Sequence, residues 1–265
     1  MKKYIIFLCA VLVAGCTKII DVEYEEIDDM YVVQAYFSVE NSYILLDKSC
    51  NMDEPMQSDG ISTATISING ENSGICRFEH ISDGCYMPIE SANFVAGEDY
   101  TLSVEIEDER FTSTARLYAQ PIIDEITFSQ QQFTADMNLV FCTVTIQDIE
   151  GEDNYYRYRF RYFATEDEEE GLVPSWSLVK QGEDGEKIWI MTHLYTDEDR
   201  DLEDGDEITI EVQAIDRGAY EYFYTLSLSG NSSTNPTSNL EGGCLGFFSP
   251  YSLTSITKIF SYDDL

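Results

Sequence analysis

The chain has 265 residues, 43% of them hydrophobic, and a formal net charge of −35 at pH 7. This length and apolar content suffice for one large β domain or for two domains of ordinary size. So strong a negative charge argues against nucleic-acid binding, because no basic surface is available to displace phosphate counterions, and against charge-driven binding to anionic lipid head groups. An acidic surface that stays solvated instead suits an exposed protein.

Residues 1–15 have the pattern of a bacterial lipoprotein signal peptide. Two lysines precede an almost unbroken apolar run that ends at Ala14, and Gly15 then stands directly before Cys16. The run is shorter than the roughly 20 residues that a spanning helix needs, so it indicates export. We expect cleavage before Cys16 and acylation of this residue, which would anchor the mature chain to the outer membrane. The alternative is that Cys16 is an ordinary buried thiol.

Residues 16–30 form an acidic tether between the lipid and the fold. A solvated linker explains such a segment. Acidic residues soon after a lipidated cysteine also resemble the tag that directs lipoproteins of the Bacteroidota to the cell surface. Residues 17–20 separate the acids from Cys16 here, so the match is partial. We expect the anchored chain to face the cell exterior, with the periplasmic face as the alternative.

Residues 31–119 are predicted to form an immunoglobulin-like β-sandwich. In 62–69, apolar and polar residues alternate with the period of two that a half-buried strand requires. The alternation in 100–107 likewise places its apolar residues on one face. About seven short strands separated by turn signals are typical of this fold. The expected strands are 31–38, 42–47, 62–69, 75–79, 85–88, 100–107 and 111–117.

Residues 120–265 are predicted to form a second β-rich domain with one amphipathic helix. Pro121 marks the boundary, since proline interrupts one pattern and an apolar strand begins after it. The helix is expected within 216–229, where apolar residues recur at helical spacing: Ala219, Tyr220, Phe223, Tyr224 and Leu228. The fold class is therefore all-β and mainly antiparallel. The strands expected in this half are 125–129, 139–148, 155–164, 175–180, 187–193, 207–215 and 245–261.

The cysteines allow one disulfide to be considered. Of the seven cysteines, Cys9 lies in the signal and Cys16 is the acylation site, which leaves an odd number in an exported chain. Cys76 and Cys85 bracket a turn signal and could face each other across a hairpin. Such a bridge would stabilise the fold by about 2–3 kcal/mol. The alternative is that both are free, and at least one cysteine of the chain must remain a buried thiol.

The stretch 156–162 alternates aromatic residues with Arg157, Arg159 and Arg161. In a strand, this spacing places the arginines on one face and the aromatics on the other. Three guanidinium groups in a row could form an anion site or a surface for a partner. They could equally pair with acids on neighbouring strands, and we favour this pairing.

Asp197, Asp199 and Asp201 occupy alternate positions, as the first ligands of a calcium loop do. The glycine that an EF-hand loop requires next is replaced by Leu202, so the segment is not an EF-hand. A solvated acidic loop is the favoured interpretation, and calcium is the only cofactor that the sequence suggests.

No catalytic signature is present in the sequence. The two histidines, His80 and His193, share no motif, and neither a nucleophile elbow nor a P-loop occurs. We therefore predict that the protein is not an enzyme.

Motifs in a fixed order along the chain carry a family resemblance. The opening strand 31–37, the Ala-Thr-Ile-Ser-Ile strand at 64–68 and the Gly-Glu-Asp-Tyr-Thr-Leu element at 97–102 come first. The most specific motif is Asn-Pro-Thr-Ser-Asn-Leu at 235–240, followed by Gly-Phe-Phe at 246–248. Together these segments resemble a family of Bacteroidota lipoproteins, the domain of unknown function 4249.

The resemblance implies an accessory lipoprotein of the kind found alongside TonB-dependent outer-membrane receptors, with no catalytic residues to transfer. We expect a surface-anchored, non-enzymatic binding partner of such a receptor in nutrient uptake. The alternative is an adhesin or fimbria-like structural protein. Lipoprotein fimbrial subunits need cleavage after a basic residue to free a groove for strand exchange. The first arginine here, Arg77, lies inside a predicted strand, which argues against that alternative.

Overall fold

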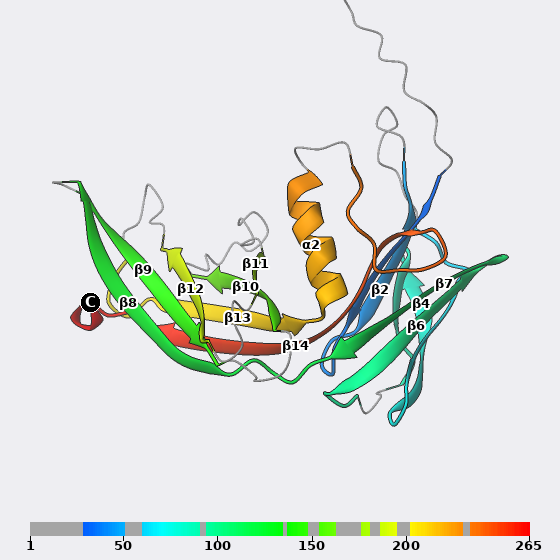
Figure 1. Ribbon diagram of the computed structural model, residues 1–265, viewed down its shortest axis with the longest axis horizontal. Helices are drawn as coiled ribbons and strands as arrows, with labels where there is room; N and C mark the ends of the chain where they lie inside the picture. The colour runs from blue at the N-terminus through cyan, green and yellow to red at the C-terminus, as the bar shows by residue number, and fades with distance from the viewer. Residues whose placement is uncertain are drawn as a thin grey trace, which may run out of the picture.

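The computed structural model shows two β-rich units that share one long strand (Figure 1). It describes residues 29–50, 60–90, 94–134, 137–147, 154–162, 176–180, 186–194, 202–229 and 234–265. The signal peptide, Cys16 and most of the tether lie outside the described residues, as do Asp197, Asp199 and Asp201. No helix in the described part is long and apolar enough to cross a membrane.

The first unit is a β-sandwich built from consecutive short strands. Apolar side chains alternate inward, as the sequence predicts for β6, where Tyr100, Leu102 and Val104 are fully buried. Backbone hydrogen bonds of 2.7 and 3.1 Å between Thr112 and Glu241 bring the last strand beside the chain that enters β14. The strands are β1 (Tyr31–Phe37), β2 (Tyr43–Lys48), β3 (Thr65–Gly70), β4 (Gly74–Ser82), β5 (Cys85–Pro88), β6 (Glu98–Ile106) and β7 (Glu109–Leu117).

The second unit packs two sheets around its own core. One sheet holds β8 (Ile123–Thr134), β9 (Met137–Ile146) and β12 (Ile188–His193). The other holds β10 (Tyr155–Arg161), β11 (Ser177–Lys180), β13 (Glu207–Ile215) and the second half of β14 (Leu245–Ile259). Buried side chains from both sheets form this core, among them Phe128, Val144, Phe160, Ile210, Val212 and Phe260. The predicted all-β, mainly antiparallel fold class is confirmed.

Strand β14 connects the two units. Its first half pairs in parallel with β1, from Val32 opposite Leu245 to Phe37 opposite Pro250. Its second half pairs in antiparallel with β13. As a result, eleven strands form one continuous sheet, in the order β11-β10-β13-β14-β1-β2-β5-β4-β3-β6-β7. A division of the chain at residue 120 leaves out this return of the C-terminal segment to β1.

The predicted amphipathic helix is present as α2 (Arg217–Ser229), which stands on the sheet between the two units (Figure 1). Asp216 caps its N-terminus by accepting a hydrogen bond from the Ala219 backbone N–H at 2.9 Å. Ala219, Tyr222 and Phe223 are its buried residues. Tyr224 and Leu228, which the spacing placed on the apolar face, are 49% and 50% exposed. The helix therefore packs through a face rotated from the predicted one, centred on Tyr222 and Phe223.

Of the two alternatives for Cys76 and Cys85, the disulfide is not formed and both thiols are free. The hairpin of β4 and β5 does form, but its register places Ser82 opposite Cys85. Cys76 lies near the far end of the longer strand β4, where it pairs with Ile68 of β3. Cys76 is buried, and burial raises the pKa of its thiol, which makes it a poor nucleophile.

Candidate functional site

A pocket of about 480 Å³ lies at the junction where β14 passes from one unit to the other. The turn between β1 and β2, the segment that follows β7, and one face of β10, β13 and β14 all contribute to its walls. This position is typical of ligand sites, which occur preferentially between structural units, and the volume lies in the usual range. The side chains that define its chemistry are Tyr36, Tyr43, Arg157, Trp176, Gln213 and Tyr251.

Strand β10 has the alternation that the sequence predicts. Tyr156 and Phe160 are buried in the core of the second unit. Arg157 and Arg159 lie on the other face and line the pocket. The sheet thus separates an apolar face, which packs inward, from a cationic face directed at the junction.

Two of the three arginines of β10 pair with an acid on the neighbouring strand. Glu211 of β13 is directly opposite Arg159 in the register, and the two side chains form a close ion pair. The Nη2 atom of Arg161 lies 3.4 Å from the other carboxylate oxygen of Glu211. Arg159 and Arg161 therefore pair with an acid on the neighbouring strand, as the sequence analysis favoured for the three arginines.

Arg157 has different surroundings. It is only 8% exposed, and its guanidinium carbon lies 3.8 Å from the ring centroid of Phe223 and 5.0 Å from that of Trp176. Its polar partner is the Tyr36 hydroxyl. Among the described residues, no carboxylate forms an ion pair with it. Burial lowers the pKa of Arg157 to about 10, so the group stays charged at neutral pH.

The tyrosine hydroxyls beside Arg157 are neutral. Tyr36 and Tyr43 stack with ring centroids 4.8 Å apart. Burial raises the pKa of Tyr43 to about 12 and also raises that of Tyr36, so both hydroxyls stay protonated. Glu40, an exposed residue of the turn between β1 and β2, also lines the pocket. The pocket therefore combines the buried Arg157 guanidinium with uncharged hydrogen-bonding groups, and Arg159, paired with Glu211, lies beside them.

Gln213 contributes an unpartnered acceptor. It sits on β13 directly opposite Arg157, and its side chain is 7% exposed. Its Oε1 atom has no hydrogen-bond partner within the described part of the chain. Buried polar groups are nearly always paired, so an orphan acceptor beside an unpaired cation indicates a place where an external molecule supplies both partners.

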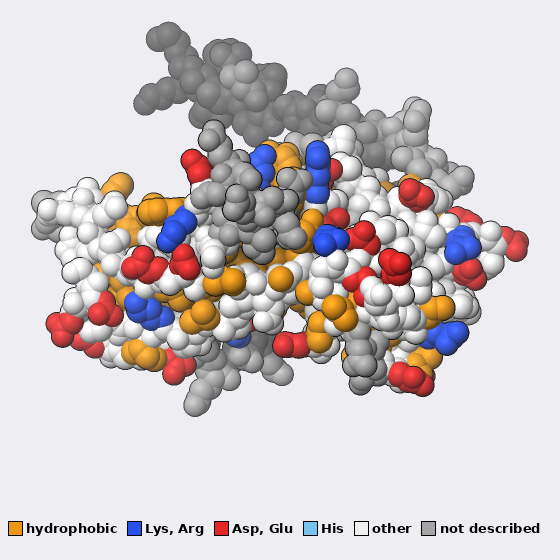
Figure 2. Space-filling view, turned by 60° about the horizontal axis from the view of Figure 1, so that its bottom comes forward, with side chains coloured by type: hydrophobic (Ala, Val, Ile, Leu, Met, Phe, Trp, Pro, Cys, Tyr) orange, Lys and Arg blue, Asp and Glu red, His pale blue; other side chains and the backbone are white. Residues whose placement is uncertain are grey.

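Basic side chains do not gather into a patch on the molecular face shown in Figure 2. Lys and Arg side chains are scattered among Asp and Glu side chains across it. This face therefore carries no broad basic surface.

Sequence reasoning identified Arg157 but missed its neighbours. Tyr36, Tyr43, Gln213 and Tyr251 come from four strands that only the folded sheet brings together. The one available signal was Gln213, a polar residue in the otherwise apolar end of β13. In the described residues, no three His, Cys, Asp or Glu side chains gather as a metal site requires.

Comparisons with known proteins assign a family without a described activity. The sequence model described as "Domain of unknown function (DUF4249)" matches residues 17–257. No curated protein matches the chain. A segment of chicken tenascin with two fibronectin type-III domains is 12% identical, with 88% of this chain and 100% of that chain covered and a TM-score of 0.26. A cytokine receptor complex is 10% identical. The match covers 89% of this chain and 100% of that chain, with a TM-score of 0.25. Scores this low carry no argument about function.

Proposed function

The chain belongs to the family of domain of unknown function 4249, and we propose that it is a non-enzymatic lipoprotein that binds a ligand as the accessory partner of a TonB-dependent outer-membrane receptor. The signal pattern before Cys16 supports an outer-membrane lipid anchor, and the acidic tether supports exposure to the cell exterior. Binding alone is proposed because the junction pocket offers a fixed cation and neutral hydrogen-bonding groups.

The observation that carries this proposal is the buried, unpaired Arg157 in the junction pocket. A charge removed from water is costly unless a counter-charge is present. A bound anion would supply this counter-charge. An accessory protein that captures a nutrient for a receptor needs such a site.

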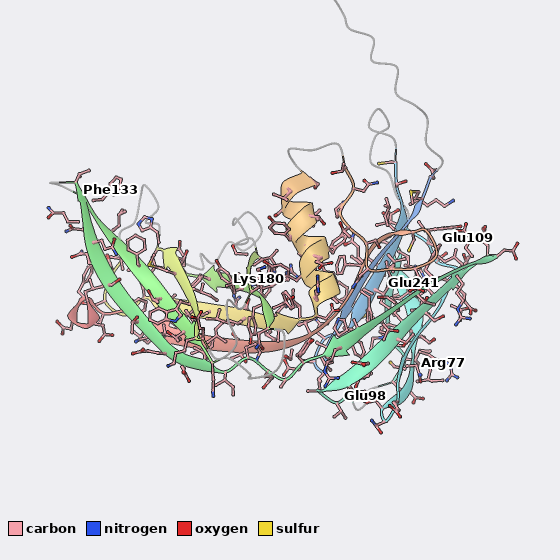
Figure 3. The ribbon with its side chains drawn as sticks, in the orientation of Figure 1. Arg77, Glu98, Glu109, Phe133, Lys180 and Glu241 are labelled. Atoms are coloured by element: carbon pink, nitrogen blue, oxygen red, sulfur yellow. The ribbon has the colours of Figure 1, made fainter. Side chains whose placement is uncertain are left out.

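A role as an adhesin or fimbria-like structural protein is the second candidate, and the strand edges of the second unit favour it. β12 is an edge strand on which Trp189 and Met191 are 68% and 59% exposed. Phe133, 71% exposed, stands at the tip of the hairpin of β8 and β9 (Figure 3). Exposed apolar side chains on a free edge suit strand addition between subunits.

The test is affinity purification of the tagged native protein from outer membranes in mild detergent, followed by mass spectrometry. Stoichiometric recovery of one TonB-dependent receptor is expected. Cys16→Ala serves as the matched control, because it should abolish incorporation of labelled palmitate and release the protein from the membrane fraction. Recovery of the lipoprotein alone, or in ladders of itself, would contradict the receptor partnership and favour the structural role.

A further inference from the structure

We propose that the junction pocket recognises a hydroxylated monocarboxylic acid, of the sugar-acid type, by holding its carboxylate on Arg157 and a neighbouring hydroxyl on Gln213. This inference rests on the proposed binding function and deepens it by naming the ligand class.

The charge of the site favours an anion. Arg157 is the unpaired cation, since Arg159 and Arg161 share Glu211. The hydroxyls of Tyr36 and Tyr43 beside it are protonated, and Arg159 is a second cation nearby. A bound carboxylate would supply the counter-charge that Arg157 lacks.

The geometry of Arg157 favours a planar anion. Contacts with Phe223 and Trp176 fix the guanidinium against two rings. Because a guanidinium has five N–H donors in one plane, the bond to Tyr36 leaves further donors unused. A carboxylate takes two parallel N–H···O bonds from such a group.

The orphan acceptor specifies a donor on the ligand. Oε1 of Gln213 accepts no hydrogen bond within the described residues, and it needs an O–H or N–H group. Arg157 and Gln213 are directly opposite each other on paired strands, which places their Cα atoms about 4.5–5.5 Å apart. The donor on the ligand must therefore lie close to its carboxylate, as a hydroxyl does in uronic and aldonic acids.

The walls suit a ring that carries several hydroxyls. Tyr36, Tyr43, Tyr251 and Trp176 supply aromatic surface and hydroxyls to the same pocket. Its volume of about 480 Å³ has room for a sugar ring. Both units line the pocket, so a bound ligand would contact each of them.

Titration calorimetry on the full chain in mild detergent tests this inference, with D-glucuronate, D-galacturonate and D-gluconate as probes. At least one of them should bind at least tenfold more tightly than D-glucose, which lacks the carboxylate, and than cyclohexanecarboxylate, which lacks the hydroxyls. Inorganic phosphate and sulfate should also bind at least tenfold more weakly. Failure of all three sugar acids to bind, or equal binding of phosphate or D-glucose, would overturn the inference.

Variants of Arg157 and Gln213 test whether these two residues bind the ligand. Arg157→Lys keeps the charge but not the two parallel bonds, and it should weaken binding about tenfold. Gln213→Glu places an acid opposite Arg157 and should abolish binding while the thermal unfolding midpoint is kept or raised. Arg77→Gln, an exposed site on β4 in the other unit (Figure 3), is the matched control and should leave affinity within twofold. Unchanged affinity in Gln213→Glu would overturn the assignment.

The two proposals fail separately. If no sugar acid binds but the receptor still copurifies with the wild-type chain, the ligand class is wrong and the partnership stands. If a sugar acid binds through Arg157 and no receptor is recovered, the site is right and the partnership is wrong.

Discussion

Glu98 is a buried carboxylate that several hydrogen bonds hold in its charged form (Figure 3). The Ser73 hydroxyl donates to Oε2 at 2.7 Å, and the backbone N–H of Asn72 donates to Oε1. The Tyr100 hydroxyl also lies 3.2 Å from Oε2. The bond from Ser73 is the largest cause of a lowered pKa of Glu98, and it outweighs the opposing effect of burial.

This lowered pKa makes part of the stability dependent on pH. A carboxyl whose pKa is lower in the folded state than in the unfolded state stabilises the fold above its unfolded pKa, about 4.3. The contribution is lost as pH falls through the folded pKa. We expect Glu98→Gln to lower the unfolding midpoint at pH 7, with a difference from wild type that shrinks towards pH 3.

Thermal unfolding from pH 7 to pH 3 measures the difference. Asp99→Asn, at an exposed neighbour that pairs with Arg116 at 3.3 Å across a partly exposed surface, is the matched control and should have little effect. A constant difference between wild type and Glu98→Gln across this range would contradict the assignment.

The arginines of β10 show what could be predicted for single residues and what could not. Alternation along one strand is a local property, so the sequence places Arg157, Arg159 and Arg161 on one face. The identity of the unpaired arginine depends on Glu211, which lies on a strand about fifty residues later in the chain. Register between distant strands is set by the packed sheet, so no local pattern reports it.

At the scale of elements, Gly246 is required where β14 first pairs with β1. Its φ is +104°, and a Cβ there would lie 1.9 Å from the carbonyl oxygen of Val33. Gly243 has a similar φ of +91°, but its Cβ would have no atom within 4 Å. A side chain at Gly243 would therefore meet only backbone strain, whereas a side chain at Gly246 would also clash with the neighbouring strand.

We expect Gly243→Ala to reduce the free energy of unfolding by roughly 1–2 kcal/mol, the cost of a left-handed conformation. Gly246→Ala should reduce it by at least about 3 kcal/mol, because the backbone of β1 must also move. Urea unfolding followed by circular dichroism gives both values. Equal losses in the two variants would show that β14 does not approach β1 this closely.

The elements themselves were largely predictable, whereas the buried face of α2 was not. Each expected strand corresponds to an observed one, because period-two alternation survives into a half-buried sheet. For the helix, spacing alone favoured Tyr224 and Leu228. Phe247 contacts Phe223, which the spacing included, and Tyr222, which it did not, with ring centroids 4.8 and 4.7 Å away. A helix standing on a sheet buries whichever residues meet that sheet, and these depend on its tilt.

At the scale of the whole molecule, β14 gives the first unit part of its core. Phe248 is fully buried there and Cys244 is 5% exposed, although both come from the C-terminal part of the chain. The Asn239 side chain also fixes this segment, since it accepts from the Phe248 N–H at 2.9 Å and donates to its carbonyl oxygen at 2.8 Å. The strand that completes the sandwich is therefore distant in sequence. A domain boundary placed at Pro121 from the local pattern could not reveal that this strand belongs to the first unit.

The shared strand predicts that the first unit does not fold from its own contiguous sequence. A fragment of residues 31–119 would leave β1 with an unpaired edge and a cavity in place of Phe248, and exposed edges promote aggregation. We expect this fragment to show no cooperative unfolding transition by circular dichroism. The same fragment joined through a flexible linker to residues 234–250 should regain one, because β1 recovers its parallel partner and Thr112 its backbone bonds to Glu241. A cooperative transition in the shorter fragment would show that β14 only adds to a unit that is already stable.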